Sequence, residues 1–260
     1  MVLRQVWATE YEAWRRRRGQ NPAAMNFFSR QTAGADYYEL LGRIHSFLKP
    51  RTYVEIGIRQ GHSFRLAKTA TASVGIDPAP ALEQKPRRGA RVFPMTSDEF
   101  FARHDLAEEL GGQAVDLAFV DGMHLFEFAL RDFANLEKFC HRDSTILVHD
   151  CYPVDRASAA RERATQVWSG DVWKLIVCLK KYRPGLQIAT VDVAPTGLGI
   201  IRRLDPRSTI LTSLLDSLYA EFVPYDYGRI EPDKAQQLNR VGNRWNEIES
   251  VLSAGPCAAK

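Results

Sequence analysis

The apolar positions of this chain follow two different periods. Between residues 52 and 150, short runs of apolar residues alternate with stretches in which apolar positions recur every three or four residues. The first pattern is typical of buried strands and the second of amphipathic helices, and their alternation predicts a parallel sheet covered on both faces. The expected strands are residues 52–56, 73–77, 90–94, 115–121 and 145–150, and the expected helices are 63–71, 97–110 and 125–139.

The regions on either side of this core have a different pattern. Residues 1–48 are expected to be largely helical, with a stop at Lys49-Pro50, and a further helix is expected at 171–181. Two strands, 187–193 and 197–203, are separated by Ala-Pro-Thr, which is short enough for a hairpin. Helix-like stretches follow at 210–222 and 233–252. The predicted organisation is a helical N-terminal cap (1–48), an α/β domain (49–204) and a helical C-terminal extension (205–260).

A turn with two glycines follows the first strand. Its sequence is Glu55-Ile-Gly57-Ile-Arg-Gln-Gly61-His-Ser63. Glycines allow backbone amides to approach a ligand, and the start of a following helix supplies partial positive charge. The spacing differs from the Gly-x-Gly-x-x-Gly of dinucleotide-binding proteins. Taken alone, Gly57 and Gly61 could simply make a tight turn.

An acidic residue, Asp77, ends the second expected strand. At this place a carboxylate can accept hydrogen bonds from both hydroxyls of a ribose. Ser97 and Asp98, just beyond the third strand, could border an adenine. Asp77 could instead be a local cap, but its combination with the glycine turn favours a nucleoside-type ligand.

The fourth and fifth strands end in acids and histidines. Asp121-Gly-Met-His124 follows one strand, and His149-Asp150 ends the next. Because the carboxyl ends of parallel strands share one edge, we expect these side chains to converge. Carboxylates suit a hard cation such as Mg²⁺, which lowers the pKa of a bound hydroxyl, and a neutral histidine can take the proton. Structural roles stay open: Asp121 could bond backbone groups, His124 could begin a helix, and His149 could be a strand-end residue.

Over about residues 50–203, the chain resembles the class I S-adenosylmethionine-dependent methyltransferases. The resemblance lies in the glycine turn, in Asp77 and in the predicted order of five parallel strands plus a hairpin. The resemblance implies a Rossmann-like, seven-stranded α/β sheet. It also implies that the glycines line the methionine end of the cofactor, that Glu55 lies near its ammonium group, and that Asp77 holds its ribose. The cofactor-binding residues implied are Glu55, Gly57, Gly61, Ser63, Asp77, Ser97, Asp98 and Asp121.

The Asp-Gly-x-His sequence before a strand that ends in an acid is similar to the metal-dependent O-methyltransferases of sugars and the cephalosporin-hydroxylase-like group. This similarity implies that Asp121 and Asp150 bind the metal and that His124 is the catalytic base, with Asp121 beside it. The group commonly has two adjacent acids at the fifth strand, and here one is His149. Either His149 coordinates in place of the acid, or metal binding is weak or absent.

The expected function is therefore methylation of a sugar hydroxyl on a glycan or glycosylated metabolite, with S-adenosyl-L-methionine and a divalent cation such as Mg²⁺. A metal-independent small-molecule methyltransferase, with His124 as base, is the main alternative. An RNA methyltransferase and a non-catalytic cofactor-binding protein are two others. Trp168, Asp171 and Lys174 could contact the sugar, or this stretch could instead pack Trp173 into the core and begin a helix.

The net charge of +4 is concentrated at the N-terminus. Residues 1–20 contain five arginines and two glutamates, so the other 240 residues are nearly neutral. A nearly neutral body argues against a nucleic-acid partner. Arg15 to Arg18, beside Trp7, Tyr11 and Trp14, form a solvated basic face next to a packing stripe, or they bind an acceptor on an anionic carrier.

Two further features concern the compartment. The four cysteines lie far apart without a Cys-x-x-Cys pair, which indicates reduced thiols rather than a disulfide framework or a zinc site. No apolar run approaches the roughly 20 residues of a membrane span, and the N-terminus lacks the apolar segment of a secretory signal. We therefore expect a cytoplasmic protein, for which a homo-oligomer stays open.

Overall fold

The computed structural model describes residues 36–68, 70 and 72–253. Most of the expected N-terminal cap, including the arginines at 15–18 and their neighbouring aromatic residues, lies outside the described residues. Among the described residues, no helix has both the length and the apolar character needed to cross a membrane.

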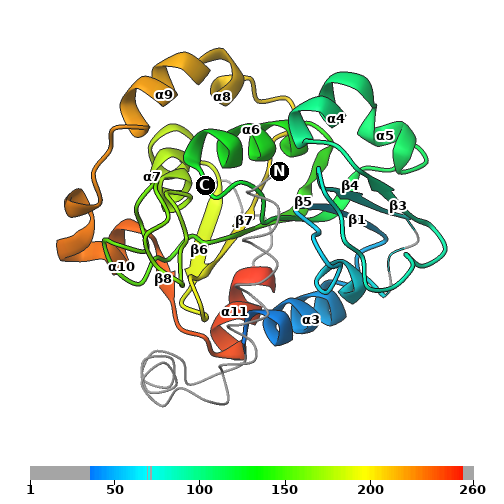
Figure 1. The fold of residues 1–260 in the computed structure, drawn as a ribbon, viewed down its shortest axis with the longest axis horizontal. Coiled ribbons are helices and arrows are strands. Elements are labelled where there is room, and N and C mark those ends of the chain that lie inside the picture. Colours follow the sequence, from blue (N-terminus) through cyan, green and yellow to red (C-terminus); the bar gives the residue numbers. More distant parts are fainter. Residues whose placement is uncertain (1–35, 69, 71, 254–260) are drawn as a thin grey trace, which may run out of the picture.

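An eight-stranded mixed sheet forms the centre of the molecule, in the order β3-β2-β1-β4-β5-β7-β6-β8 (Figure 1). The first five strands are parallel, and β7 pairs antiparallel with both β5 and β6. The predicted α/β class is confirmed, with one strand more than expected. The strands are β1 (Thr52–Ile56), β2 (Ala72–Ile76), β3 (Ala90–Phe93), β4 (Val115–Val120), β5 (Cys140–His149), β6 (Gln187–Val191), β7 (Leu198–Arg202) and β8 (Arg240–Val241).

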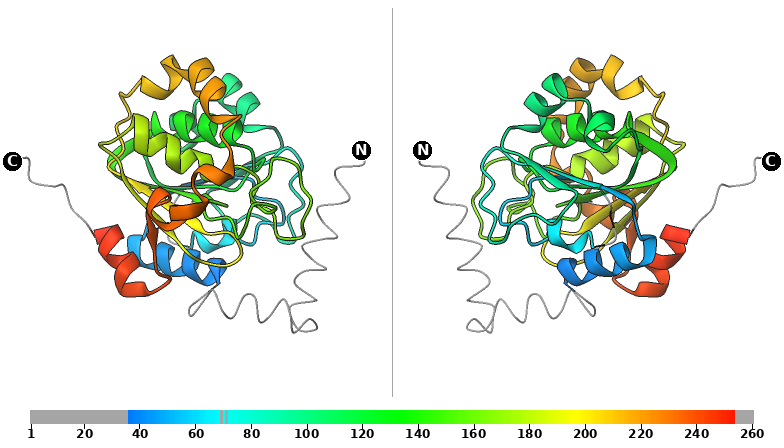
Figure 2. Two further views of the ribbon diagram at one scale, coloured as in Figure 1. Left: turned by 90° about the vertical axis from the view of Figure 1, so that its left-hand side faces the viewer. Right: turned by 90° about the vertical axis from the view of Figure 1, so that its right-hand side faces the viewer.

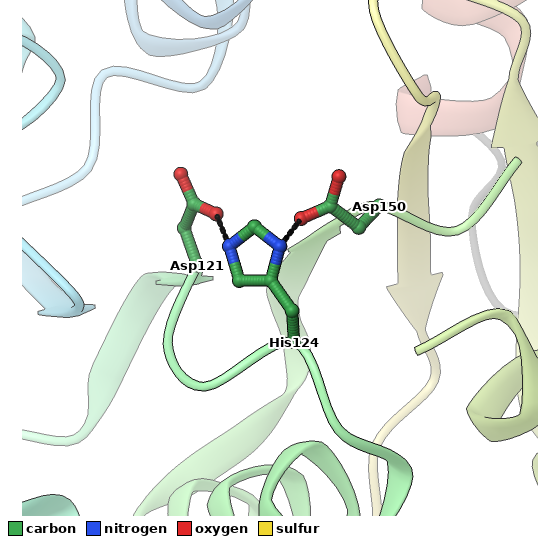
Figure 3. Close-up of side chains that lie close together, drawn as sticks. All are labelled: Asp121, His124 and Asp150. Atoms are coloured by element: carbon green, nitrogen blue, oxygen red, sulfur yellow. Dashed lines mark ion pairs between the residues drawn. The ribbon is translucent and has the colours of Figure 1, made fainter. Parts of the chain in front are cut away.

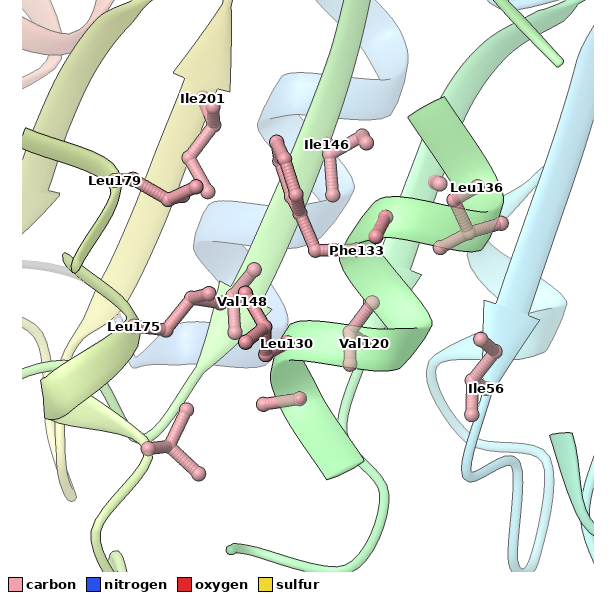
Figure 4. Close-up of a cluster of buried hydrophobic side chains, with 14 of the residues drawn as sticks. Ile56, Val120, Leu130, Phe133, Leu136, Ile146, Val148, Leu175, Leu179 and Ile201 are labelled. Carbon is pink, nitrogen blue, oxygen red and sulfur yellow. The ribbon is translucent and has the colours of Figure 1, made fainter. Parts of the chain in front are cut away.

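Helices cover both faces of the sheet, as Figure 2 shows. The central strands are buried on both faces, and successive residues contribute to opposite cores: Val54 lies in one cluster and Tyr53 in the other. In the first cluster, α6 packs over β1, β4 and β5 (Figure 4). That face carries α4 (Ser97–Arg103), α5 (Leu106–Glu109), α6 (Phe126–Glu137) and α7 (Trp173–Tyr182), and the opposite face carries α3 (Tyr37–Leu48) and α11 (Trp245–Ser253).

The C-terminal segment passes from one face of the sheet to the other. It begins with α8 (Ile210–Ser213) and α9 (Leu215–Phe222), continues through α10 (Lys234–Gln237), and adds β8 to the edge of the sheet before α11. The prediction of one helix over 233–252 was therefore wrong. Asn239, with φ +50°, ends α10, and its carbonyl accepts a hydrogen bond from the backbone of Thr190 in β6. The chain after Asn239 therefore pairs with the open edge of β6 and forms β8.

The helix expected at 63–71 was also wrong, because the chain forms only a short 3-10 turn, Phe64–Leu66. This connection must return along β1, whose five residues span about 17 Å, whereas a nine-residue α-helix spans about 14 Å. The helix expected at 97–110 is divided into α4 and α5, because Asp105 starts a new helix by accepting a hydrogen bond from the backbone of Ala107.

The described cysteines agree with the expectation of free thiols. Cys140, Cys151 and Cys178 are all buried and unpaired. Their burial raises the pKa of each thiol, so they behave as small apolar groups.

Candidate active site

Two neighbouring strands bring Asp121 and Asp150 together. Strands β4 and β5 run parallel with Val120 opposite Val148. Asp121 directly follows β4, and Asp150 directly follows β5. His124, in the turn before α6, places its imidazole between the two carboxylates (Figure 3). Its Nδ1 lies 2.8 Å from Oδ2 of Asp150, and its Nε2 lies 3.5 Å from Oδ1 of Asp121. The predicted convergence is confirmed for these three residues.

His149 completes this group from the end of β5. Its Nδ1 lies 3.3 Å from both Oδ1 of Asp121 and Oδ2 of Asp150. Its Nε2 is buried without a hydrogen-bond partner among the described residues. The ring stacks on Tyr37 of α3 at a centroid distance of 4.5 Å. Strand β5 therefore directs one nitrogen of His149 at the acids while α3 covers the ring.

The four side chains balance each other electrostatically. Burial disfavours the charged form of every one, but the opposite charges outweigh it. The imidazoles hold the pKa of Asp150 at about 2 and that of Asp121 well below its usual range. The carboxylates raise the pKa of His124 to about 10 and that of His149 well above its usual value. The protein alone thus forms a buried cluster of two anions and two cations.

The loop between β6 and β7 fixes Asp150. The hydroxyl of Thr196 donates a hydrogen bond to Oδ1 of Asp150, which leaves Oδ2 facing His124 and His149. Asp150 itself has a left-handed backbone, with φ +63°. Thr196 was not among the predicted site residues, because its place beside Asp150 depends on the pairing of β5 with β7.

The glycine turn lies directly against this cluster. Gly57 has φ +88°, and a Cβ at this position would lie 2.1 Å from the carbonyl oxygen of Asp121. Only glycine allows this approach of the first and fourth strand ends. The turn and Asp121 therefore form one continuous surface at the carboxyl edge of the sheet.

Glu55 is fully buried below this turn. Its carboxyl accepts hydrogen bonds from the hydroxyl of Tyr53 at 2.6 Å and from that of Ser63 at 2.5 Å. Burial raises the pKa of Glu55 to about 8, although these hydrogen bonds act in the opposite direction. Tyr53 was missed by the sequence reasoning, although its two-residue spacing from Glu55 places both on the same face of β1.

Asp77 and Asp98 have different surroundings. The oxygens of Asp77 accept hydrogen bonds from the backbone of Arg59 and Ala79, both at 2.7 Å, so the carboxylate is held rigidly after β2. Each oxygen retains acceptor capacity. Asp98 instead forms two hydrogen bonds with Arg131 of α6, at 2.8 and 2.7 Å. Its carboxylate thus links α4 to α6, while Ser97 lies in the first turn of α4.

The candidates for sugar contact around Trp168 make contacts within the protein. Trp173 is 1% exposed and belongs to the core. Asp171 and Lys174 are buried and form an ion pair of 2.9 Å, and Lys174 also donates to the carbonyl of Val223. Trp168 stacks on the imidazole of His124. The alternative of core packing is therefore correct for Trp173, and the sequence did not reveal the contact of Trp168.

Comparisons with known proteins concern the domain and the fold. Residues 54–151 match a family model described as a methyltransferase domain. No curated protein matches the sequence at a significant level. The structure is similar to the O-methyltransferase TomG from Streptomyces achromogenes, solved with S-adenosylmethionine, with 14% identity and a TM-score of 0.50 over 67% of this chain and 82% of TomG.

A protein from Klebsiella pneumoniae assigned as an O-methyltransferase is similar to the same degree. Its identity is 12% and its TM-score is 0.50, over 76% of this chain and 97% of that protein. At such identities the solved structures establish a shared fold. Residues 54–151 therefore resemble a methyltransferase domain in sequence, and the shared fold is the one implied by the resemblance to class I S-adenosylmethionine-dependent methyltransferases.

Proposed function

We propose that this chain methylates an acceptor oxygen, and that the acceptor is a sugar hydroxyl of a glycan or glycosylated metabolite. The observation that carries the proposal is the position of His124 between Asp121 and Asp150, directly beside the glycine turn. Methyl transfer requires a nucleophilic oxygen held in line with the sulfonium carbon, so positioning and removal of the hydroxyl proton are the main demands. The names of the similar structures as O-methyltransferases support the choice of oxygen.

The residues proposed for the cofactor form a path along the carboxyl edge. Gly57 and Gly61, both with positive φ, open the backbone for the methionine end. Glu55 supplies a buried carboxyl that can pair with the ammonium group, and Asp77 has acceptor capacity for the ribose. Ser63, Ser97 and Asp98 stay in the proposed set, Ser63 as the partner of Glu55 and Asp98 through its contact with Arg131.

His124 is the proposed base. Asp150 holds its Nδ1 at 2.8 Å, whereas the contact of Nε2 with Asp121 is longer, at 3.5 Å. Once the imidazolium has lost its proton from Nε2, this nitrogen can take the hydroxyl proton, while Asp150 accepts the hydrogen bond from Nδ1–H and orients the ring, an arrangement common to histidine bases. The acceptor oxygen then forms its new bond to the methyl carbon, and the electron pair of the broken bond stays on sulfur.

The donor set also fits a divalent cation. Two carboxylates and Nδ1 of His149, which lies 3.3 Å from one oxygen of each, offer oxygen and nitrogen ligands. The ligand atoms of Asp121, His124 and Asp150 also lie within 4.8 Å of one another. Asp121, Asp150 and His149 would hold the ion. When bound, Mg²⁺ or a similar cation lowers the pKa of the acceptor hydroxyl.

A specific observation favours the metal-independent alternative. Asp150 already has Thr196 on one oxygen and His124 on the other, so the histidine and acid can act as a pair without an ion. In that case the acceptor could be another small molecule with a hydroxyl group. Both versions keep His124 as the base.

The proposal is tested by label transfer from S-[methyl-³H]adenosylmethionine to a panel of methyl glycosides. Catechol serves as a non-sugar acceptor. We expect a labelled glycoside and, for the metal-assisted version, loss of the rate in EDTA and its return with Mg²⁺ or Mn²⁺. A rate unchanged by EDTA would select the metal-independent version. Labelling of catechol alone would contradict a sugar acceptor.

A further inference from the structure

The segment Trp168–Ser169–Gly170–Asp171, between β5 and α7, holds His124 from several sides. We call it the clamp segment. The indole of Trp168 lies parallel to the imidazole of His124, with an interplanar angle of 7° and a centroid distance of 5.4 Å. A flat stack of this kind opposes rotation of the imidazole about its Cβ–Cγ bond. It therefore restricts which way Nδ1 and Nε2 point.

The clamp segment also holds the backbone of His124. Gly170 has φ +57°, and a Cβ on it would lie 1.8 Å from the carbonyl oxygen of His124. The backbone N–H of Asp171 donates to that same carbonyl at 3.2 Å, and Oδ1 of Asp171 accepts from the backbone of Phe126 at 2.7 Å. The turn is thus fixed at the carbonyl of His124 and at the N–H of Phe126.

This support matters because His124 has an unfavourable backbone. Its φ is +55°, in the left-handed region that costs a residue with a side chain about 1–2 kcal/mol. Neighbouring contacts must hold such a conformation. The clamp segment supplies such contacts here.

The clamp segment is itself rigidly held. The indole N–H of Trp168 donates to the carbonyl of Ala160 at 2.6 Å, and the backbone of Ser169 donates to the carbonyl of Ser158 at 3.0 Å. Asp171 pairs with Arg161 at 2.6 Å and with Lys174 at 2.9 Å. Both the ring stack and the backbone contacts therefore rest on the folded loop between β5 and α7.

We propose that Trp168 is a positioning residue for His124: its stack keeps the imidazole aimed between Asp150 and the acceptor oxygen. The inference rests on the proposed role of His124 as base. Trp168 acts through His124 and needs no contact with the acceptor. Since a misplacement of about 1 Å in a reacting group can cost about 100-fold in rate, loss of the stack should reduce turnover without affecting cofactor binding.

The test compares Trp168→Ala, Trp168→Phe and the matched control Trp245→Ala, a half-buried tryptophan on α11. Long-range ¹H–¹⁵N correlation spectra of the histidine side chains, recorded with S-adenosylhomocysteine, report on the imidazole directly, and the His124→Ala spectrum assigns its signal. Trp168→Ala should shift or broaden the His124 signal, Trp168→Phe should largely restore it, and Trp245→Ala should leave it in place. An unchanged His124 signal in Trp168→Ala overturns the inference.

Turnover gives the second readout through a double-mutant cycle with His124→Ala, using the glycoside methylated best by the wild type. Trp168→Ala should lower kcat about 30-fold with KM for S-adenosylmethionine nearly unchanged, and should have no further effect in His124→Ala. An equal loss in both backgrounds contradicts action through His124. If His124→Ala keeps the wild-type rate, the proposed base is wrong, while the spectra still decide whether Trp168 positions the ring.

Discussion

Oδ2 of Asp150 lies 2.8 Å from Nδ1 of His124, and both residues have left-handed backbones, with φ of +63° and +55°. Neither conformation is favourable for a residue with a side chain, so the surrounding fold must hold the pair. Thr196 supports the aspartate and the clamp segment supports the histidine. The pair is therefore built from three loops at the carboxyl edge of the sheet.

Removal of the Thr196 hydroxyl should destabilise the protein. Thr196→Val keeps the shape of the side chain but removes the donor to the buried carboxylate of Asp150, at an expected cost of about 1.5–3 kcal/mol in the free energy of unfolding. Urea unfolding measures it. Thr190→Val is the matched control, since the hydroxyl of Thr190 is buried without a partner among the described residues. That variant should be neutral or stabilising, and equal losses in both would refute the argument.

Gly57→Ala should disrupt the contact between the strand ends. Its Cβ would meet the carbonyl of Asp121, so we expect a loss of several kcal/mol in the free energy of unfolding and loss of cofactor binding. Gly111→Ala is the control, because Gly111 also has a positive φ but has nothing within 4 Å of a Cβ. It should cost about 1 kcal/mol. Thermal melts of both variants measure the difference, and similar melting temperatures would show that the approach to Asp121 is unimportant.

Glu55 should make stability depend on pH. Burial raises the pKa of Glu55 from 4.5 to about 8, so the folded state holds the proton more tightly than the unfolded state. Below about pH 4.5 the carboxyl is neutral in both states and does not lower the free energy of unfolding. As the pH rises to about 8, it lowers the free energy of unfolding increasingly. Each unit of pKa shift corresponds to about 1.4 kcal/mol.

Glu55→Gln stays neutral and should gain stability over the wild type as the pH rises from 5 to 8.5, by up to several kcal/mol in cofactor-free protein. Urea unfolding at several pH values measures this gap. Glu108→Gln removes an exposed carboxylate of α5 and should show a constant gap. A constant gap for Glu55→Gln as well would mean that Glu55 ionises as easily in the folded protein as in the unfolded one.

Binding of a cation should stabilise the fold. If Asp121, Asp150 and His149 hold the ion, Mn²⁺ or Mg²⁺ at 100 times its dissociation constant adds about 2.7 kcal/mol to the free energy of unfolding. Thermal melts with and without the ion should show the increase in the wild type and in Asp216→Asn, an exposed aspartate of α9. Asp150→Asn should lose it. The same increase in Asp150→Asn would place the ion elsewhere.

Much of the fold could be predicted from local sequence. The strand β1 was predicted with its observed bounds, because a short β-rich run of five residues lies between Pro50 and Gly57. The convergence of Asp121 and Asp150 also followed, since parallel neighbours end at one edge. The missed β8 shows the limit: its two residues form a strand only because the edge of β6 is open beside them.

The details of the site were less predictable. Trp168, Thr196 and Tyr37 reach the cluster from a long loop, a hairpin and a helix on the opposite face. No spacing in the sequence relates them to His124, Asp150 or His149. Their positions follow from tertiary packing, as does the use of Asp98 in an ion pair with Arg131.

The most direct measurement of the central claim is label transfer from S-[methyl-³H]adenosylmethionine by the wild type and His124→Ala, with the affinity of both for S-adenosylhomocysteine measured by calorimetry. We expect the wild type to label a sugar hydroxyl, and His124→Ala to be slower by about 100-fold or more with unchanged affinity for S-adenosylhomocysteine. Transfer by His124→Ala at the wild-type rate would contradict this expectation.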